Sequence, residues 1–432
     1  MVLPNFRSSG KILLWAVLAG GLLFLALLAL QLAEMAYVAR LPASKSAFCP
    51  EGDRLVVCSP RMVRGSFPRR KEPGAFRVFI VGSSQAMGSP YVFQRFNTIS
   101  RLFPNEGGLA TWLQDYLSAA LPGRAVEVIN AAQGNSVAMN RHLEVFREVA
   151  AAGSPDLVVV LAGNNERPAE VRDNILPAGV DLDAALAPAV RSFRGALREM
   201  TRLSSREGFR LYLLTVPNNV RDYIPEGDEA AALFRRARAL DEQGRRDEAR
   251  LLYVRAKDRD RSFFRTRSAF NEAIRQASGP GVRVIDMERL LRAYAQDGIP
   301  GGDLFHDACH LKLRANQLAA YEVARYFTKD YGLSPDLGER LRGLRLRSVD
   351  RRALGVLYWL KVVKWAQYRF LRIFFPRELR SFEPNAGAVL RGYWGSLQDL
   401  KVIDDQILLR RDGVMAGSGR AGAGAKDERG HP

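Results

Sequence analysis

Five short stretches of the sequence contain the residue types that acyl transfer requires, namely a nucleophile, a base and hydrogen-bond donors. Each of the first four follows an apolar run of the kind that forms a buried strand. In an open parallel sheet, ligands bind in the crevice beyond the carboxyl ends of the strands. Polar residues that recur at this position indicate an enzyme. The stretches are Gly82-Ser83-Ser84, Gly134-Asn135-Ser136, Gly163-Asn164-Asn165-Glu166, Pro217-Asn218-Asn219 and Asp307-Ala308-Cys309-His310.

An alternation of apolar strands and helical segments is expected to position these stretches. Continuous apolar strands separated by helices are typical of a parallel sheet that is covered on both faces. The sequence therefore predicts an α/β fold, a three-layer α/β/α sandwich with a parallel sheet. We expect strands near 77–81, 125–130, 156–161, 210–216 and 282–286, and helices near 108–120, 137–151, 184–206, 228–277 (broken) and 312–328.

The connection between the fourth and fifth predicted strands is longer than such links usually are. Inside it, at about residues 226–262, small and apolar residues at helical spacing resemble one tetratricopeptide-like hairpin with Gly244 at the turn. Arrays of such repeats generally need about three units to be stable. We therefore expect this hairpin to pack on the α/β body as a lid or substrate wall. An ordinary amphipathic insertion explains the pattern at least as well.

Residues 76–328 resemble an SGNH (GDSL-type) serine hydrolase, of the bacterial membrane-anchored kind that carries a tetratricopeptide-like insertion. Two positions depart from the family pattern: Ser83 replaces a frequent aspartate, and Glu166 replaces the aspartate after the asparagine. Neither position carries the proton transfer in the family scheme. One block alone occurs by chance in many chains, whereas four in order are specific. The matching residues are Ser84, Gly134, Asn165 and the pair Asp307 and His310.

The resemblance implies a role for each matching residue. Ser84 would be the nucleophile, His310 would accept its proton, and Asp307 would orient the imidazole and stabilise the imidazolium. The backbone N–H groups of Ser84 and Gly134 and the side-chain amide of Asn165 would form the oxyanion hole. We expect no metal and no cofactor.

The same residue types also occur in purely structural roles. Ser84 could be a helix cap, and Gly134 and Asn165 could be ordinary turn residues. His306 is the competing base, but the Asp-x-x-His spacing favours His310.

Further polar residues are weaker candidates. Asn218 and Arg221 follow the fourth predicted strand and could contact substrate, although a loop that caps the next helix is the preferred interpretation. His142, on a predicted helix, is expected at the surface or in the core, and His431 lies in the tail.

Length and charge limit the class of protein. The 432 residues are enough for one sizeable domain with appendages. A net charge of +18 is compatible with nucleic acid or with an anionic membrane surface. Without zinc-ligand spacing, an RNP-like motif or a basic helix with heptads, nucleic acid is not expected as a partner.

An uncharged, mostly aliphatic run at residues 12–30 predicts a membrane anchor. A spanning helix needs about 20 apolar residues, more than the core of a cleaved signal peptide. Arg7 and Lys11 favour an N-terminus inside the cell, although Arg40 and Lys45 weaken the asymmetry. We therefore expect a single-pass protein of the bacterial inner membrane with its body on the periplasmic side.

The cysteines fit an exported protein. Cys49 and Cys58 lie in a polar stretch where a local disulfide and two free thiols are about equally supported. Cys309, beside His310, is expected to fill a buried niche rather than act as a nucleophile.

The C-terminal hundred residues are basic and aromatic. Cations at Lys361, Lys364 and Arg372 align with Tyr368 along a helix that also contains Trp359. The pattern predicts a helix that lies in the bilayer interface, and a helix docked on the enzyme body is an equal alternative.

These patterns predict an organisation and a function. The leading function is a membrane-anchored serine esterase that removes a short O-linked acyl group from a carbohydrate or envelope component. The alternatives are an O-acyltransferase in exopolysaccharide modification and a non-catalytic envelope scaffold. The expected segments are a cytoplasmic flank and transmembrane anchor at 1–36, a lead-in at 37–75, the hydrolase domain at 76–328, a basic helical extension at 329–412 and a flexible tail at 413–432.

Overall fold

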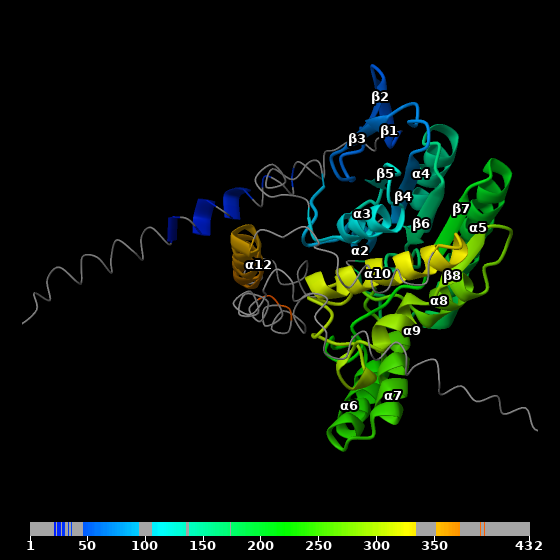
Figure 1. Ribbon diagram of the computed structural model, residues 1–432. Coiled ribbons are helices and arrows are strands. Elements are labelled where there is room, and N and C mark those ends of the chain that lie inside the picture. The colour runs from blue at the N-terminus through cyan, green and yellow to red at the C-terminus, as the bar shows by residue number, and fades with distance from the viewer. Residues whose placement is uncertain are drawn as a thin grey trace, which may run out of the picture.

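The protein is described from a computed structural model (Figure 1). The described residues are 21, 22, 24–26, 28–30, 33, 36, 46–94, 106–134, 138–172, 174–333, 351–371, 389 and 393. The predicted tail at 413–432 lies outside them.

A five-stranded parallel sheet forms the centre of the molecule, as the apolar runs predict. The strand order is β5-β4-β6-β7-β8, so β4 lies between the second and third strands in sequence. This is a common order of doubly wound sheets, in which ligands bind beside the first strand, where the connections change direction. The strands are β4 (Phe76–Gly82), β5 (Val126–Asn130), β6 (Leu157–Leu161), β7 (Arg210–Leu214) and β8 (Val282–Ile285).

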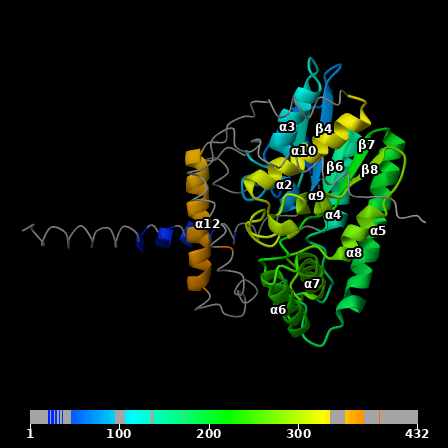
Figure 2. The ribbon, with the colours of Figure 1, turned by 60° about the horizontal axis from the view of Figure 1, so that its bottom comes forward.

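Helices flank the sheet and complete the predicted layers (Figures 1 and 2). One group contains α3 packed against α10, and the other contains α4 against α5 and α5 against α8. Every residue of β4 and β6 is buried, because both faces of the central strands are covered. The helices are α2 (Ser84–Met87), α3 (Leu109–Ala120), α4 (Met139–Ala152), α5 (Leu182–Glu207), α8 (Ser268–Arg275), α9 (Met287–Arg292) and α10 (Leu313–Asp330).

The lead-in contains a small antiparallel sheet that its sequence did not predict. Its strands are β1 (Phe48–Glu51), β2 (Arg54–Val57) and β3 (Ser66–Pro68). A disulfide joins Cys49 to Cys58, whose Cα atoms lie 5.7 Å apart. Phe67 packs edge-to-face on Phe79 of β4, with ring centroids 5.2 Å apart. The lead-in is therefore attached to the α/β body rather than forming a free linker.

The long connection after β7 folds as the expected helical hairpin. Helices α6 (Asp228–Glu242) and α7 (Arg246–Arg259) pack on each other, and Gly244 occupies the turn with a φ of +78°. The hairpin core packs on Val220 and Ile299, which belong to two loops of the body. In Figure 1, α6 and α7 extend away from the sheet at one end of the molecule.

Helix α12 (Arg351–Leu371) lies beside the α/β body (Figure 2). Leu354, Leu357 and Tyr358 are buried in the core, which supports the docked-helix alternative for the first half of α12. Val356 and Trp359 on the same helix are 50% and 45% exposed.

The predicted anchor at 12–30 falls largely outside the described residues. Among the helices that the structure does describe, none is both long and apolar enough to cross a membrane. The anchor stays a prediction.

Candidate active site

Ser84 lies at the first position of α2, directly after the central strand β4. The chain leaves β4 at Gly82, whose φ is +152°, and passes close to β6. A Cβ at Gly82 would lie only 2.0 Å from the carbonyl oxygen of Leu161, so only glycine fits there. This tight exit places the hydroxyl of Ser84 at the carboxyl edge of the sheet.

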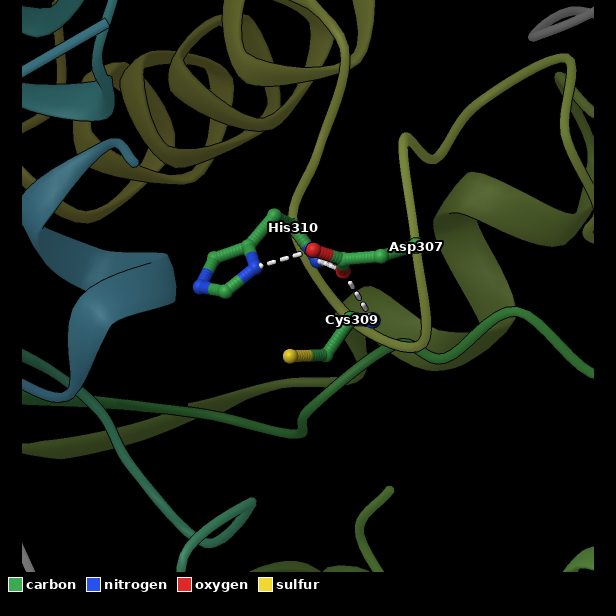
Figure 3. A group of neighbouring side chains, drawn as sticks. All are labelled: Asp307, Cys309 and His310. Atoms are coloured by element: carbon green, nitrogen blue, oxygen red, sulfur yellow. Dashed lines mark hydrogen bonds and ion pairs between the residues drawn. The ribbon is translucent and has the colours of Figure 1, made fainter. Parts of the chain in front are cut away.

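Three side chains meet at this edge in the arrangement that the sequence predicts. The Oγ atom of Ser84 lies 2.9 Å from Nε2 of His310. The Nδ1 atom of His310 lies 2.7 Å from Oδ2 of Asp307. Figure 3 shows the imidazole of His310 hydrogen-bonded through Nδ1 to Asp307, with its other ring nitrogen on the side away from Asp307. The geometry is that of a nucleophile, a base and an orienting carboxylate.

The loop of Asp307 and His310 is closed by its own hydrogen bonds. Oδ1 of Asp307 accepts the N–H groups of Cys309 and His310 at 3.0 and 2.8 Å. Burial raises the pKa of Asp307, but the interactions with His310 and the two N–H groups outweigh it, so the pKa lies below its usual value. Asp307 is therefore ionised at neutral pH and can hold the N–H of His310.

Two oxyanion donors have no partner among the described residues. The side-chain Nδ2 of Asn165 is buried without a hydrogen bond, and the residue is 9% exposed. The N–H of Ser84 lies in the first turn of α2. The N–H groups of a first turn have no hydrogen-bond acceptor within the helix. A buried donor without a partner costs free energy unless a ligand satisfies it. Both groups are suited to an oxyanion.

The third predicted donor, Gly134, is differently placed. Its N–H donates to the carbonyl oxygen of Arg61 in the lead-in at 3.0 Å. A Cβ at Gly134 would lie 1.6 Å from Nε2 of Gln94, so a larger residue there would require the Gln94 side chain to move. The expectation that this N–H contributes to the oxyanion hole is therefore corrected for this structure, because the lead-in satisfies the group.

Asn218 and Arg221 also differ from their predicted role in substrate binding. Asn218 is buried. Its Nδ2 donates to the carbonyl oxygen of Val216, and its Oδ1 accepts the N–H of Thr266. The guanidinium of Arg221 contacts Asp241 of α6 at 2.7 Å and Asp297 at 3.2 Å. Both side chains are occupied in holding loops and the hairpin, which agrees with the preferred interpretation of this stretch as a structural loop.

Asn219, which the sequence analysis names only as part of the stretch Pro217-Asn218-Asn219, is a structural support of the site. Its N–H donates to the carbonyl oxygen of Ala308 at 3.0 Å, and its Nδ2 donates to that of Asp307 at 3.1 Å. Its position after an apolar run suggested a place at the site, but its specific role could not be predicted because its partners lie far away in sequence.

A second series of buried contacts links Ser83, Asn164 and Cys309, each of which lies next to a residue of the site. Oγ of Ser83 donates to Oδ1 of Asn164 at 2.5 Å, and Nδ2 of Asn164 contacts Sγ of Cys309 at 3.5 Å. Ser83 is thus a neutral donor at the position where the family pattern that the sequence resembles has a frequent aspartate. Cys309 is 6% exposed, in agreement with the predicted buried niche.

The contacts of the other described histidines exclude them as the base for Ser84. His306 is buried with its Nε2 atom 2.6 Å from the hydroxyl of Tyr91, so it is not the base. His142 is buried on α4, within the predicted alternatives of surface or core. His310 is therefore the described histidine that contacts Ser84.

Asp307, Cys309 and His310 also form a group of potential metal ligands, with donor atoms within 4.8 Å of one another (Figure 3). The hydrogen bond between His310 and Asp307 already engages Nδ1 and Oδ2 with each other. Buried Cys309 has its pKa raised by desolvation, which disfavours the thiolate that metal binding needs. The arrangement fits a hydrogen-bonded triad better than a metal site.

No family model matches the sequence, and no curated protein matches it. Among solved structures, the chain is similar to a lipase/acylhydrolase from Enterococcus faecalis, with 17% identity and a TM-score of 0.33 over 60% of this chain and 98% of that one. It is also similar to an acetyl xylan esterase, with 15% identity and a TM-score of 0.32 over 57% and 98% of the two chains. A catalytic mutant of an acetylxylan esterase from Geobacillus stearothermophilus shows 18% identity and a TM-score of 0.29 over 60% and 96%. These values are too low to assign chemistry, for which the triad geometry is the ground.

Proposed function

We propose that this protein is a serine esterase of the SGNH type that removes a short O-linked acyl group from a carbohydrate or envelope component. The observation that carries the proposal is the continuous hydrogen-bonded series from Ser84 through His310 to Asp307. The acetyl xylan esterases among the similar structures are consistent with a carbohydrate ester as substrate.

The geometry suits a double-displacement reaction. Oγ of Ser84 attacks the acyl carbonyl carbon while its proton passes to Nε2 of His310. The carbonyl oxygen becomes an oxyanion, which the N–H of Ser84 and Nδ2 of Asn165 stabilise. The C–O bond to the alcohol breaks, and the imidazolium returns its proton to the leaving oxygen. Water then attacks the acyl-serine by the same steps and releases the acid.

Hydrolysis of p-nitrophenyl acetate tests this proposal. We expect Ser84→Ala to lose nearly all turnover while its thermal unfolding stays that of the wild type, because the covalent route is removed. The exposed Ser205 provides a matched control, and Ser205→Ala should keep full activity. Wild-type turnover in Ser84→Ala would remove Ser84 as the nucleophile.

We further propose that residues 12–30 anchor the protein in the bacterial inner membrane, with the catalytic body in the periplasm. The uncharged run itself supports this proposal, together with the exposed leucines Leu22 and Leu25, which are 68% and 58% accessible. A fusion of alkaline phosphatase to the C-terminus should be active, and one of green fluorescent protein should be dark. The reverse pattern would place the body in the cytoplasm and exclude a periplasmic substrate.

A further inference from the structure

Four buried rings connect the C-terminal extension to the catalytic loops, and we call them the His306 cluster: Tyr91, His306, Tyr358 and Tyr393. The hydroxyl of Tyr358 on α12 donates to that of Tyr91 at 3.0 Å, and the Tyr91 hydroxyl bonds Nε2 of His306 at 2.6 Å. Tyr393 stacks on His306, with centroids 4.7 Å apart and planes at 9°. Each of the four residues is less than 5% exposed.

The cluster is attached to the catalytic base through the backbone. His306 and His310 occupy the same loop, and the N–H of His306 donates to the carbonyl oxygen of His310 at 2.9 Å. Phe305 and Leu311 pair across the base of this loop. A shift of the His306 ring would therefore move the backbone that holds the imidazole of His310.

The cluster is attached to the nucleophile as well. Tyr91 ends the turn that begins at Ser84, because the N–H of Tyr91 donates to the carbonyl oxygen of Gly88 at 2.9 Å. The N–H groups of Gly88 and Ser89 in turn donate to the carbonyl oxygen of Ser84 at 3.1 and 3.0 Å. One set of rings thus fixes the backbone on both sides of the hydrogen bond between Ser84 and His310.

His306 takes part in this cluster as a neutral ring. Burial lowers its pKa to about 3, and the charges of Lys312 and Lys361 act in the same direction. A neutral imidazole can accept a hydrogen bond from the Tyr91 hydroxyl at Nε2. It can also stack flat on Tyr393 without the cost of a buried charge.

We propose that Tyr358 and Tyr393 are positioning residues for the pair of Ser84 and His310, so that the C-terminal extension is part of the catalytic unit. The inference rests on the proposed function for its effect on turnover, but the position of His310 can be measured separately. Displacement of a catalytic group by about 1 Å can cost about 10²-fold in rate, so a cluster that holds two loops at once has a large effect on catalysis.

Substitutions in the full-length protein separate positioning from plain stability. Tyr393→Ala removes the stacked ring, and Tyr393→Phe restores it. Tyr358→Phe removes only the hydroxyl that donates to Tyr91. Tyr212→Phe is the matched control, because it also removes the hydroxyl of a buried tyrosine, which donates to Asp330 at 2.8 Å.

We expect Tyr393→Ala to lower kcat for p-nitrophenyl acetate by about tenfold or more, with KM little changed. Tyr358→Phe should lower kcat several-fold, whereas Tyr393→Phe and Tyr212→Phe should stay near the wild type. The chain has four histidines, so ¹⁵N-labelled histidine gives a simple spectrum. The ring signals of His310 should shift in Tyr393→Ala and Tyr358→Phe but not in Tyr212→Phe.

The spectrum decides the inference even if turnover is absent. Unmoved His310 signals in both Tyr393→Ala and Tyr358→Phe would overturn positioning by the extension. If the His310 signals shift in these variants but the wild-type protein has no esterase activity, the positioning is retained and the proposed function is rejected. If Tyr393→Ala does not fold, the His310 signals of Tyr358→Phe alone confirm or overturn the positioning.

Discussion

At the scale of single residues, the site depends on groups that have been left without partners. A folded chain rarely buries an amide without a hydrogen bond, because the loss of hydration costs about 1–3 kcal/mol. Nδ2 of Asn165 is in that state, one strand away from Ser84. The cost is understandable if the substrate supplies the missing acceptor during the reaction.

Replacement of Asn165 tests this view. Asn165→Ala should lower kcat by about 10²–10³-fold, the usual loss for one oxyanion donor, with a smaller effect on KM. The same change should leave thermal stability equal or higher, since it removes a buried amide with an unsatisfied donor. Asn140→Ala, at an exposed position on α4, is the control. An unchanged kcat would exclude Asn165 from the oxyanion hole.

At the scale of elements, Glu166 connects the asparagine block to helix α4. Its Oε1 accepts the N–H of Met139, the first residue of α4, at 2.7 Å. Burial raises the pKa of Glu166 to about 7, and the bond from Met139 and the charge of Arg167 only partly oppose it. The carboxyl group is therefore partly protonated near neutral pH.

A pH dependence of stability follows from this shift. The folded state binds the Glu166 proton more tightly than the unfolded state does, so the free energy of unfolding should fall as pH rises from about 4.5 to about 7. Glu166→Gln keeps an acceptor for Met139. It should reduce the fall in the free energy of unfolding between these pH values by about 1–3 kcal/mol. Urea unfolding at several pH values measures it, with Glu144→Gln on the exposed side of α4 as control. An identical slope in Glu166→Gln would contradict the raised pKa.

Apolar patterning predicted the elements of the body well, for a physical reason. A central strand buried on both faces must be apolar throughout, so β4 and β6 are legible as runs in the sequence. The triad was also predictable, because its residues follow strand ends or lie at short spacing. The strands β1 to β3 were not, because they are short and half polar.

Long-range contacts explain what the sequence could not predict within the site. The partner of the Gly134 N–H is Arg61, a residue of the lead-in that no local pattern connects to the glycine block. Arg221 was a weak substrate-binding candidate beside the preferred structural interpretation, and its partner Asp241 in the hairpin could not be identified from local sequence. Such pairings depend on how distant segments dock, which the local sequence does not encode.

At the scale of the whole molecule, charge and exposed apolar surface occur together. The chain carries +18, and α12 leaves Val356 and Trp359 largely uncovered although its other face is docked. Basic residues near an anionic membrane contribute about 1 kcal/mol each, within the short range that salt permits. We therefore expect the body itself to bind membranes weakly.

Vesicle sedimentation with protein lacking residues 1–36 tests this expectation. Binding to phosphatidylserine vesicles should be clear at low salt and lost at high salt. Trp359→Ala combined with Val356→Ala should weaken binding without loss of esterase activity, whereas Leu251→Ala on the hairpin, an equally exposed apolar residue, should not weaken it. If the truncated protein does not sediment with the vesicles at low salt, membrane binding by the body is excluded. Residues 12–30 would then be the only membrane contact that is still proposed.

The attachment of the lead-in also sets how far the enzyme could reach. Ser46, Ala47 and Phe48 all bond the carboxylate of Glu148 on α4, so the rigid body already begins at residue 46. If residues 12–30 cross the bilayer as proposed, only residues 31–45 separate the body from the membrane. A chain of that length spans at most about 50 Å when fully extended. The active site would then sweep a thin layer next to the bilayer, and its substrates would be those that enter this layer.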